Sequence, residues 1–266
     1  MASHPRLMPS RPRLFTAVVA RSERISPSFQ RVTITGPELG GFAWRGFDHW
    51  FRLFLPPSAA TPLHLPSVSG RSWYPSYLLI PGDVRPLCSN YTVAGYRQGA
   101  DGGELDIDVV LHGDHGDAGP TVAGWAVDAQ VGSPVGILDQ GLLFDPPADA
   151  GELVLACDET GLPAVRSILR DLEAAATGTA LLEVPASGDV AEVAAPAGVT
   201  VTWLPRDDPS AHPGQLALSA LQRHVPGPDA YAFVVGESAL ATGGRRALKK
   251  AGLAASRITF SGFWKA

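Results

Sequence analysis

The sequence predicts two domains, an antiparallel β-barrel followed by an α/β domain with a mostly parallel sheet. Up to about residue 147, apolar residues come in short, often alternating segments separated by Gly, Pro, Asp and Ser, which is typical of a barrel or sandwich. After residue 151, apolar strand-like runs alternate with segments of helical spacing, which favours a parallel sheet built from crossover units. A length of 266 residues suits two domains of roughly 100 to 150 residues each.

In the barrel half, short apolar segments between turn residues are predicted as strands. In one of them, Leu105, Ile107 and Val109 alternate with Asp106 and Asp108, which predicts one buried face and one wet face. Residues 1–13 carry scattered arginines and prolines but no apolar run, so we expect a disordered tail there. The predicted strands are 15–25, 29–36, 50–57, 90–97, 104–113 and 133–140.

In the second half, strand and helix patterns alternate after a Pro-rich linker at 146–151. We therefore place the barrel domain at 14–147 and the α/β domain at 151–266. The first predicted helix has Val165, Ile168 and Leu169 at helical spacing before a closing Gly178. The predicted strands are 153–159, 179–185, 198–205, 230–238 and 257–264, and the helices are 163–178, 212–227 and 239–253.

Charge, hydropathy and cysteine content argue against a nucleic-acid-binding protein, a membrane protein and a disulfide-bonded protein. With 21 basic and 26 acidic side chains the formal net charge is -5, and no run of like charge resembles a nucleic-acid footprint. No stretch is long and apolar enough to predict a membrane span. Cys88 and Cys157 lie among apolar residues and are interpreted as free thiols, which indicates a reducing, cytoplasmic compartment.

Polar residues follow three predicted strands of the α/β domain, where ligands of parallel sheets usually bind. Asp158, Glu159 and Thr160 follow the first strand, and Gly236 and Glu237 end the fourth. One interpretation is that Asp158 or Thr160 caps the next helix through its side-chain oxygen. Another is that this turn faces a nucleotide, and the two interpretations are compatible. No Gly-x-Gly-x-x-Gly fingerprint is present, so a nicotinamide site would be of another design.

Three further groups of residues are considered as parts of a ligand, metal or catalytic site. Phe263 and Trp264 at the last strand are more often core or interface residues than a cofactor shield, and Lys265 is either a partner for an anion or simply solvated. His112 and His115 fit no compact metal-ligand spacing, so no metal is expected. Ser238 has no evident base partner and no Gly-x-Ser-x-Gly context.

Taken in order, the motifs resemble the siderophore-interacting protein family, which belongs to the ferredoxin-reductase-like flavoproteins. The resemblance implies a six-stranded barrel that holds FAD and an α/β domain that receives NADPH or NADH. It also implies that electrons pass to a ferric siderophore in the cleft between the domains and release iron as Fe(II). The motifs are 29–39, 48–57, 85–97, 108–120 with 124–126, 155–164, 179–185, 231–238 and 261–265.

The resemblance also implies roles for individual residues. Tyr91 and Thr92, followed by Val93, would line the flavin. The diphosphate would be approached by His112, Gly113, Ala123, Gly124 and Trp125. The nicotinamide nucleotide would meet Asp158, Glu159, Thr160, Gly236 and Glu237, and the substrate cleft would contain Arg97, Phe263, Trp264 and Lys265.

The chain departs from the family pattern at the flavin site. The family signature resembles Arg-x-Tyr-Thr-x-Arg, and both arginine positions are replaced, by Ser89 and Ala94. An arginine–phosphate contact stabilises by roughly 1.5 to 3 kcal/mol, so losing two would weaken binding by about two to four decades. Arg85 and Arg97 flank the motif and are candidates to compensate.

The other departures lie in two nearby stretches. In the loop before Trp125 the family's serine position is Ala123, and the loop is one residue longer. Before Phe144 the family more often shows Gly-Pro-x-Gly, where this chain has Asp139, Gln140 and Gly141.

Two main functional hypotheses follow. The first is an NAD(P)H-dependent flavin oxidoreductase of the ferric-siderophore-reductase type. The second is a repurposed member that has lost FAD and binds or transforms, by isomerisation or cyclisation, a bulky organic metabolite in an interdomain cleft lined by Tyr91, Trp125, Phe263 and Trp264. A third hypothesis, a non-catalytic interaction module, has no direct support. In either main hypothesis the partner is a small molecule, not nucleic acid or a membrane.

Overall fold

The chain divides into two compact units in a computed structural model that describes residues 7–9, 12–99, 102–111 and 121–265. The barrel unit consists of Leu7–Arg45 and His49–Gly141. The α/β unit contains Gly46–Asp48 together with the chain from Leu142 onward. The division falls a few residues before the linker expected at 146–151, and most of the tail expected at 1–13 lies outside the described residues.

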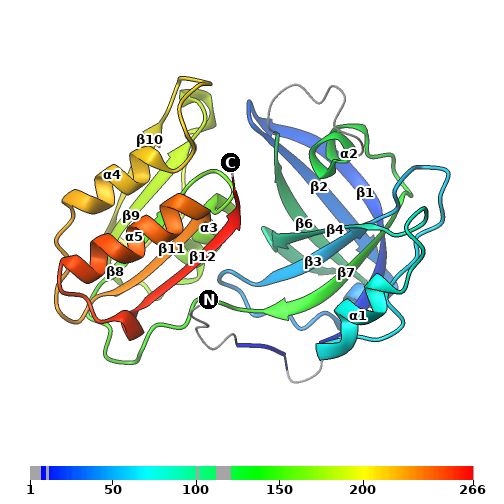
Figure 1. The fold of residues 1–266 in the computed structure, drawn as a ribbon, viewed down its shortest axis with the longest axis horizontal. Helices are drawn as coiled ribbons and strands as arrows, with labels where there is room; N and C mark the ends of the chain where they lie inside the picture. The colour runs from blue at the N-terminus through cyan, green and yellow to red at the C-terminus, as the bar shows by residue number, and fades with distance from the viewer. Residues whose placement is uncertain (1–6, 10–11, 100–101, 112–120, 266) are drawn as a thin grey trace. The chain divides into compact units, whose positions relative to one another are not determined.

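The barrel unit is one antiparallel sheet with the strand order β4-β3-β7-β1-β2-β6-β5, which confirms the predicted class (Figure 1). The predicted strand 90–97 is divided in two. Val93 and Ala94 lie between the parts, where their amides donate to the carbonyls of His49 and Asp106. The strands are β1 (Leu14–Ser26), β2 (Phe29–Gly36), β3 (Trp50–Leu55), β4 (Leu87–Thr92), β5 (Gly95–Gly99), β6 (Gly102–Val110) and β7 (Pro134–Gly141).

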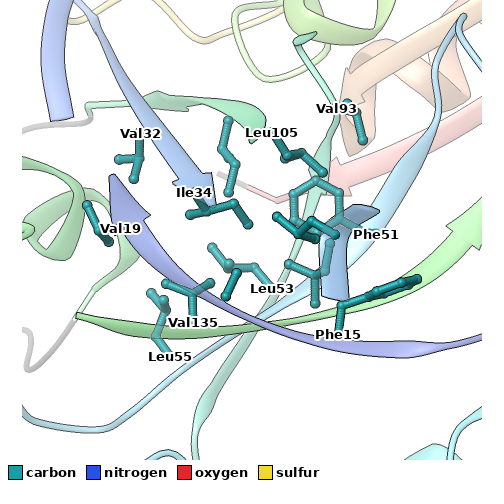
Figure 2. Close-up of a cluster of buried hydrophobic side chains, with 14 of the residues drawn as sticks. Phe15, Val19, Val32, Ile34, Phe51, Leu53, Leu55, Val93, Leu105 and Val135 are labelled. Atoms are coloured by element: carbon teal, nitrogen blue, oxygen red, sulfur yellow. The ribbon is translucent and has the colours of Figure 1, made fainter. Parts of the chain in front are cut away.

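The barrel core is formed by the inward-facing residues of these strands (Figure 2). Phe51 and Leu53 on β3 alternate with Arg52, as expected for a strand with one face in the core. Full burial of such side chains stabilises the fold by about 1.5 to 3 kcal/mol each. The expectation that Asp106 and Asp108 face water is wrong, because both are buried and paired with arginine side chains.

The α/β unit has a five-stranded, fully parallel sheet with the order β10-β9-β8-β11-β12, which confirms the predicted parallel class. The chain runs outward from β8 to β10 and then returns to β11 beside β8. The adjacent ends of β8 and β11 are therefore a topological switch point, where open parallel sheets bind ligands. The strands are β8 (Leu153–Cys157), β9 (Thr177–Val184), β10 (Gly198–Pro205), β11 (Tyr231–Glu237) and β12 (Ile258–Trp264).

The helices of this unit cover both faces of the sheet. Helices α4 (Gln215–Arg223) and α5 (Ser238–Lys250) lie side by side over one face (Figure 1). Helix α3 (Leu162–Asp171) begins beside Cys157 and Val235, which point to the other face. The prediction that α3 continues to Gly178 is wrong: Leu172 is already extended, and Gly178 lies in β9 with φ +150°.

Short helices complete the fold. Helix α1 (Trp73–Leu78) follows β3, and helix α2 (Val122–Asp128) precedes β7. Four 3-10 turns occur in the described residues: η1 (Pro37–Gly41), η2 (Gly70–Ser72), η3 (Ser187–Asp189) and η4 (Ala255–Arg257). The helices in the described ranges are all too short or too polar to span a bilayer. Cys88 and Cys157 are both free thiols, as predicted.

Candidate functional site

Tyr91 and Thr92 lie at the end of β4, an edge strand of the barrel sheet. Tyr91 is opposite Phe51 in the antiparallel register and packs, partly buried, against the barrel core. Burial raises the pKa of Tyr91. Within the described part of the chain, neither the Tyr91 nor the Thr92 hydroxyl has a hydrogen-bond partner. Two hydroxyl groups beside an open sheet edge are thus left for a ligand.

The two arginine positions of the family signature carry no charge. Ser89 lies opposite Leu53 on β3. Ala94 lies in the bend after β4, where its amide donates to the carbonyl of Asp106 at 3.0 Å. Val93, between Thr92 and Ala94, is fully buried in the core and holds this bend in place.

The arginines closest to this motif are engaged by other groups. Arg85 donates to the carbonyls of Leu78 and Ile80, at 2.8 and 3.0 Å. Arg97 donates to the carboxylate of Glu104 at 2.9 Å and to that of Asp106. Neither of the two expected compensating arginines therefore presents an unpaired guanidinium.

A third arginine, Arg52, lies on the strand next to β4. Its Nη1 donates to the side chain of Asn90 at 2.9 Å. Its guanidinium also lies over the ring of Trp73, 4.4 Å from the centroid. This side chain is held on the outer face of β3 by the aromatic residue of α1.

Arg97 belongs to a cluster of three arginines and three carboxylates on the outer face of the β1-β2-β6-β5 part of the sheet. Although burial of Asp106 opposes ionisation, hydrogen bonds from Arg97 and Thr33 lower the pKa of this carboxyl. The hydrogen bond that Arg97 donates to Asp106 correspondingly raises the pKa of the guanidinium. With all members ionised, the formal charge of the cluster is zero. The cluster consists of Arg21, Arg31, Arg97, Glu104, Asp106 and Asp108.

The candidate diphosphate residues Ala123, Gly124 and Trp125 are on helix α2. The side chain of Thr121 caps this helix by accepting from the Gly124 amide at 3.0 Å, and Trp125 packs against the barrel core. His112 and Gly113 lie outside the described residues.

In the α/β unit, the Asp158 carboxylate joins the ends of three strands. It accepts hydrogen bonds from the amides of Thr160 (2.8 Å) and Gly161 (3.2 Å), which lead into α3. It also accepts from the Glu237 amide at 2.6 Å and from the Trp264 indole at 3.2 Å. Burial, together with the nearby Glu159 charge, raises the pKa of Asp158. The Asp158 carboxylate thus orders the turn before α3. The interpretation of Asp158 or Thr160 as the cap of the helix itself is wrong, because the N-cap residue is Gly161 and no side chain caps it.

Gly236 and Glu237 end strand β11 at the same place. Gly236 has φ +131°, and a Cβ there would be 2.5 Å from the Asp158 carboxyl carbon. The Glu237 carboxylate is buried and caps α5 by accepting from the Ala239 and Leu240 amides. The carboxylates of Asp158 and Glu237 thus bind backbone groups, and Thr160 is the more exposed side chain of the set.

A buried ion pair network beside these strand ends was not predicted. Arg206 donates to Glu159 and Glu183 at 2.7 Å each. The Glu183 carboxylate in turn accepts from the Gly214 and Ala217 amides, which begin α4. One sequence signal was present: Glu183 is the single charged residue of the apolar strand 179–185.

The candidate residues at the end of β12 differ in their contacts and exposure. Trp264 contacts Asp158, and its carbonyl accepts from the Ser238 hydroxyl at 2.6 Å. Phe263 is partly exposed and Lys265 is exposed. Of the expected substrate residues in this unit, only Trp264 is thus joined to the strand-end cluster.

In the stretch before Phe144, Asp139 forms a buried pair with His49, which precedes β3 in the barrel unit. His49 Nδ1 accepts from the Arg45 amide at 3.1 Å, so the proton is on Nε2, which donates to Asp139 at 2.9 Å. Both side chains are buried. In the described residues, no group of three or more His, Cys, Asp or Glu side chains is placed to hold a metal ion.

The chain belongs to the siderophore-interacting protein family. Residues 18–142 match the siderophore-interacting FAD-binding domain. Residues 150–266 match the siderophore-interacting protein domain. Together these matches cover both halves of the chain, in agreement with the resemblance of the motifs.

Characterised relatives and solved structures agree with this assignment. The chain is 34% identical to the ferric vibriobactin reductase ViuB of Vibrio cholerae, over 96% of this chain and 89% of the relative. It is 29% identical to the NADPH-dependent ferric-chelate reductase of Escherichia coli, over 93% and 91%. A siderophore utilization protein from T. fusca has the same fold, with a TM-score of 0.80 and 30% identity over 98% of this chain and 95% of that one.

The described residues fit the ring of the family's FAD but not its diphosphate. The hydroxyls of Tyr91 and Thr92, which have no partner in the part of the chain that the structure describes, suit a polar, planar ligand at the edge of β4. At the other end, Ser89 and Ala94 carry no charge, and Arg85 and Arg97 are engaged.

Proposed function

We propose that this protein is an NAD(P)H-dependent flavin oxidoreductase that reduces a ferric siderophore or a related ferric chelate. The observation that carries the proposal is the pair of hydroxyls of Tyr91 and Thr92, which have no hydrogen-bond partner among the described residues, in a unit that matches a siderophore-interacting FAD-binding domain. The named relatives act on ferric vibriobactin and on ferric chelates, and one is NADPH-dependent. The free thiols Cys88 and Cys157 suit a reducing compartment, so we place the activity in the cytoplasm.

In this proposal the side chains bind and position, and no side-chain acid or base is required. A bound flavin would supply the redox chemistry, taking two electrons as a hydride from NAD(P)H and passing them singly to two ferric ions. Tyr91 would lie against the flavin ring, and the Thr92 hydroxyl would bond a polar atom of its edge. Both residues lie at the end of β4, where pairing with Phe51 and Trp50 of β3 fixes the backbone.

The nicotinamide nucleotide is assigned to the switch point of the α/β unit. Asp158 and Glu237 would act as positioning residues, because their carboxylates are buried and hold the strand ends and the start of α5. Thr160 and Ser238, which are partly exposed, would present the surface that the nucleotide approaches. Gly236 would act as a positioning residue, because the space left by its missing Cβ is occupied by the Asp158 carboxylate.

The second hypothesis, a member that has lost FAD and binds another organic metabolite, is favoured by one observation. The positions of both signature arginines are uncharged, which removes attraction for a diphosphate. Uptake of flavin by the protein decides between the two functions.

The proposal is tested by iron reduction under argon. Protein with added FAD and NADPH is expected to convert ferric vibriobactin or ferric citrate to Fe(II), trapped by a coloured Fe(II) chelator, with two Fe(II) formed per NADPH oxidised. Tyr91→Ala should reduce the rate at least about tenfold, whereas Tyr74→Ala, at a tyrosine 52% exposed on α1, should not. A rate with protein no higher than that of FAD and NADPH alone would refute the proposed function.

A further inference from the structure

We propose that this barrel recognises the flavin ring and not its phosphates, so that riboflavin, FMN and FAD bind with similar affinity. The inference rests on the proposed function and concerns which part of the flavin this chain binds. It predicts that the flavin is an exchangeable co-substrate and not a tightly held group.

The first step is the contrast between the two ends of the site. At the ring end, the hydroxyls of Tyr91 and Thr92 have no partner within the described residues, and the Tyr91 ring is only partly buried. At the phosphate end, Ser89 and Ala94 cannot form a charge-assisted hydrogen bond. Such bonds are about twice as strong as neutral ones, so these two positions contribute little to the binding of a phosphate.

The second step is that nearby arginines are held elsewhere. Arg97 follows the motif on β5, but its guanidinium donates to Glu104 and to the buried Asp106. Freeing it would leave the Asp106 carboxylate without its closest cation, which is unfavourable for a buried charge. Arg85 likewise donates to two backbone carbonyls, so its guanidinium is already hydrogen-bonded.

The third step is the charge directly beside Ala94. A Cβ on Gly95 would lie 3.0 Å from the carboxylate oxygen Oδ2 of Asp106. The pKa of Asp106 is lowered overall by Arg97 and Thr33 against the effect of burial, so the carboxyl is ionised at neutral pH. The six-residue charge cluster around it sums to zero. The site therefore offers a phosphate no net positive charge from this side.

The test compares three flavins by equilibrium dialysis on the full chain. Riboflavin has no phosphate, FMN has one and FAD has two. We expect dissociation constants within about tenfold of one another, and an FAD affinity that changes less than about threefold between low and high salt. Thr92→Val and Tyr91→Phe keep side-chain shape and remove one hydroxyl each, and each should weaken all three flavins by the same factor, about two- to tenfold.

A gain of phosphate recognition provides the converse test. Ser89→Arg combined with Ala94→Arg should tighten FAD relative to riboflavin by at least about tenfold, since each arginine–phosphate contact is worth roughly ten- to a hundredfold. The control is Leu79→Arg with Val131→Arg, which adds the same charge at positions 84% and 75% exposed and should leave the ratio unchanged. Urea midpoints of both double variants show whether they are folded.

The outcomes separate this inference from the proposed function. FAD binding more than about tenfold tighter than riboflavin in the unaltered chain would overturn the inference and leave the proposed function standing. Binding of none of the three flavins would overturn both. If the double-arginine variant folds but keeps the original ratio, the assignment of Ser89 and Ala94 to the phosphate end is wrong.

Discussion

Gly236 shows at the scale of one residue why the family motif at the end of β11 requires glycine. Its φ of +131° is a conformation that side chains rarely adopt, and a Cβ would meet the Asp158 carboxylate. Asp158 needs this space because its Oδ2 accepts from the Glu237 amide. The glycine therefore lets two strand ends share one buried carboxylate.

This account predicts the cost of a methyl group at that position. Gly236→Ala should lower the free energy of unfolding by about 3 kcal/mol or more, through backbone strain plus the clash with Asp158. Gly252→Ala is the matched control, because Gly252 has φ +101° in the same unit but nothing within 4 Å of the added Cβ. The control should cost about 1 kcal/mol, from strain alone.

Urea unfolding followed by circular dichroism measures both variants. Equal losses of stability in Gly236→Ala and Gly252→Ala would show that the Asp158 contact has no energetic weight.

At the scale of elements, the segment Gly46–Asp48 illustrates how a short stretch of the barrel sequence becomes part of the α/β unit. The Phe47 amide donates to the Asp171 carboxylate at 2.6 Å, and the Phe47 ring stacks on Phe144 at 5.5 Å. The Asp48 carboxylate accepts from the amides of Leu143 and Phe144 at 3.0 Å each. The segment is thus fixed at the end of α3 and at the chain that follows β7.

Asp48 makes this attachment dependent on pH. Burial raises the pKa of Asp48 from 3.8 to about 6, against the effect of its hydrogen bonds to backbone amides. The folded state therefore binds the proton more tightly than the unfolded state does. The stability from this group is fully present below about pH 4 and is lost as the pH rises to about 6.

Asp48→Asn should remove that dependence, because an amide does not ionise. Relative to the unaltered chain, the variant should gain up to about 3 kcal/mol of unfolding free energy between pH 4 and pH 7, which is the size of a shift of about two pKa units. Denaturant melts across this range, with Asp128→Asn as an exposed control, provide the measurement. A difference between Asp48→Asn and the unaltered chain that stays constant with pH would contradict the assignment.

Element boundaries show where local sequence patterns were insufficient. The predicted strand 90–97 divides because Val93 is drawn into the core and Ala94 bonds to β6, contacts far away in sequence. Helix α3 ends at Asp171 instead of continuing into the alanines, because Asp171 binds the Phe47 amide. In both cases a tertiary contact overrides a local propensity.

At the scale of the whole molecule, alternating patterns and the order of motifs were enough to predict both sheets and the family. The polar networks were not predictable in the same way. The strand pattern placed Asp106 and Asp108 in water. The register instead brings Asp108 opposite Arg31, and Asp106, which lies opposite Thr33 and Gly95, pairs with Arg97 from further along β5. Arg206 likewise reaches Glu159 and Glu183 only after β9 and β10 are paired.

For the site, the sequence identified the retained Tyr91 and Thr92 and the replaced arginines. It could not show that Arg85 and Arg97 are engaged, because that depends on side-chain partners. Neither could it show that Asp158 and Glu237 bind backbone amides. A motif therefore identifies candidate binding residues, but their side-chain partners in the folded protein decide whether they are available to a ligand.

The central claim is that this barrel accommodates a flavin ring at Tyr91 and Thr92 despite the loss of both arginines. Its most direct test is the stoichiometry of FAD bound by the full chain in dialysis against excess FAD. The account predicts saturation at one flavin per chain, with Tyr91→Ala reducing occupancy strongly under the same conditions. Absence of bound flavin at any FAD concentration would contradict it and favour a member of the family that uses this site for another ligand.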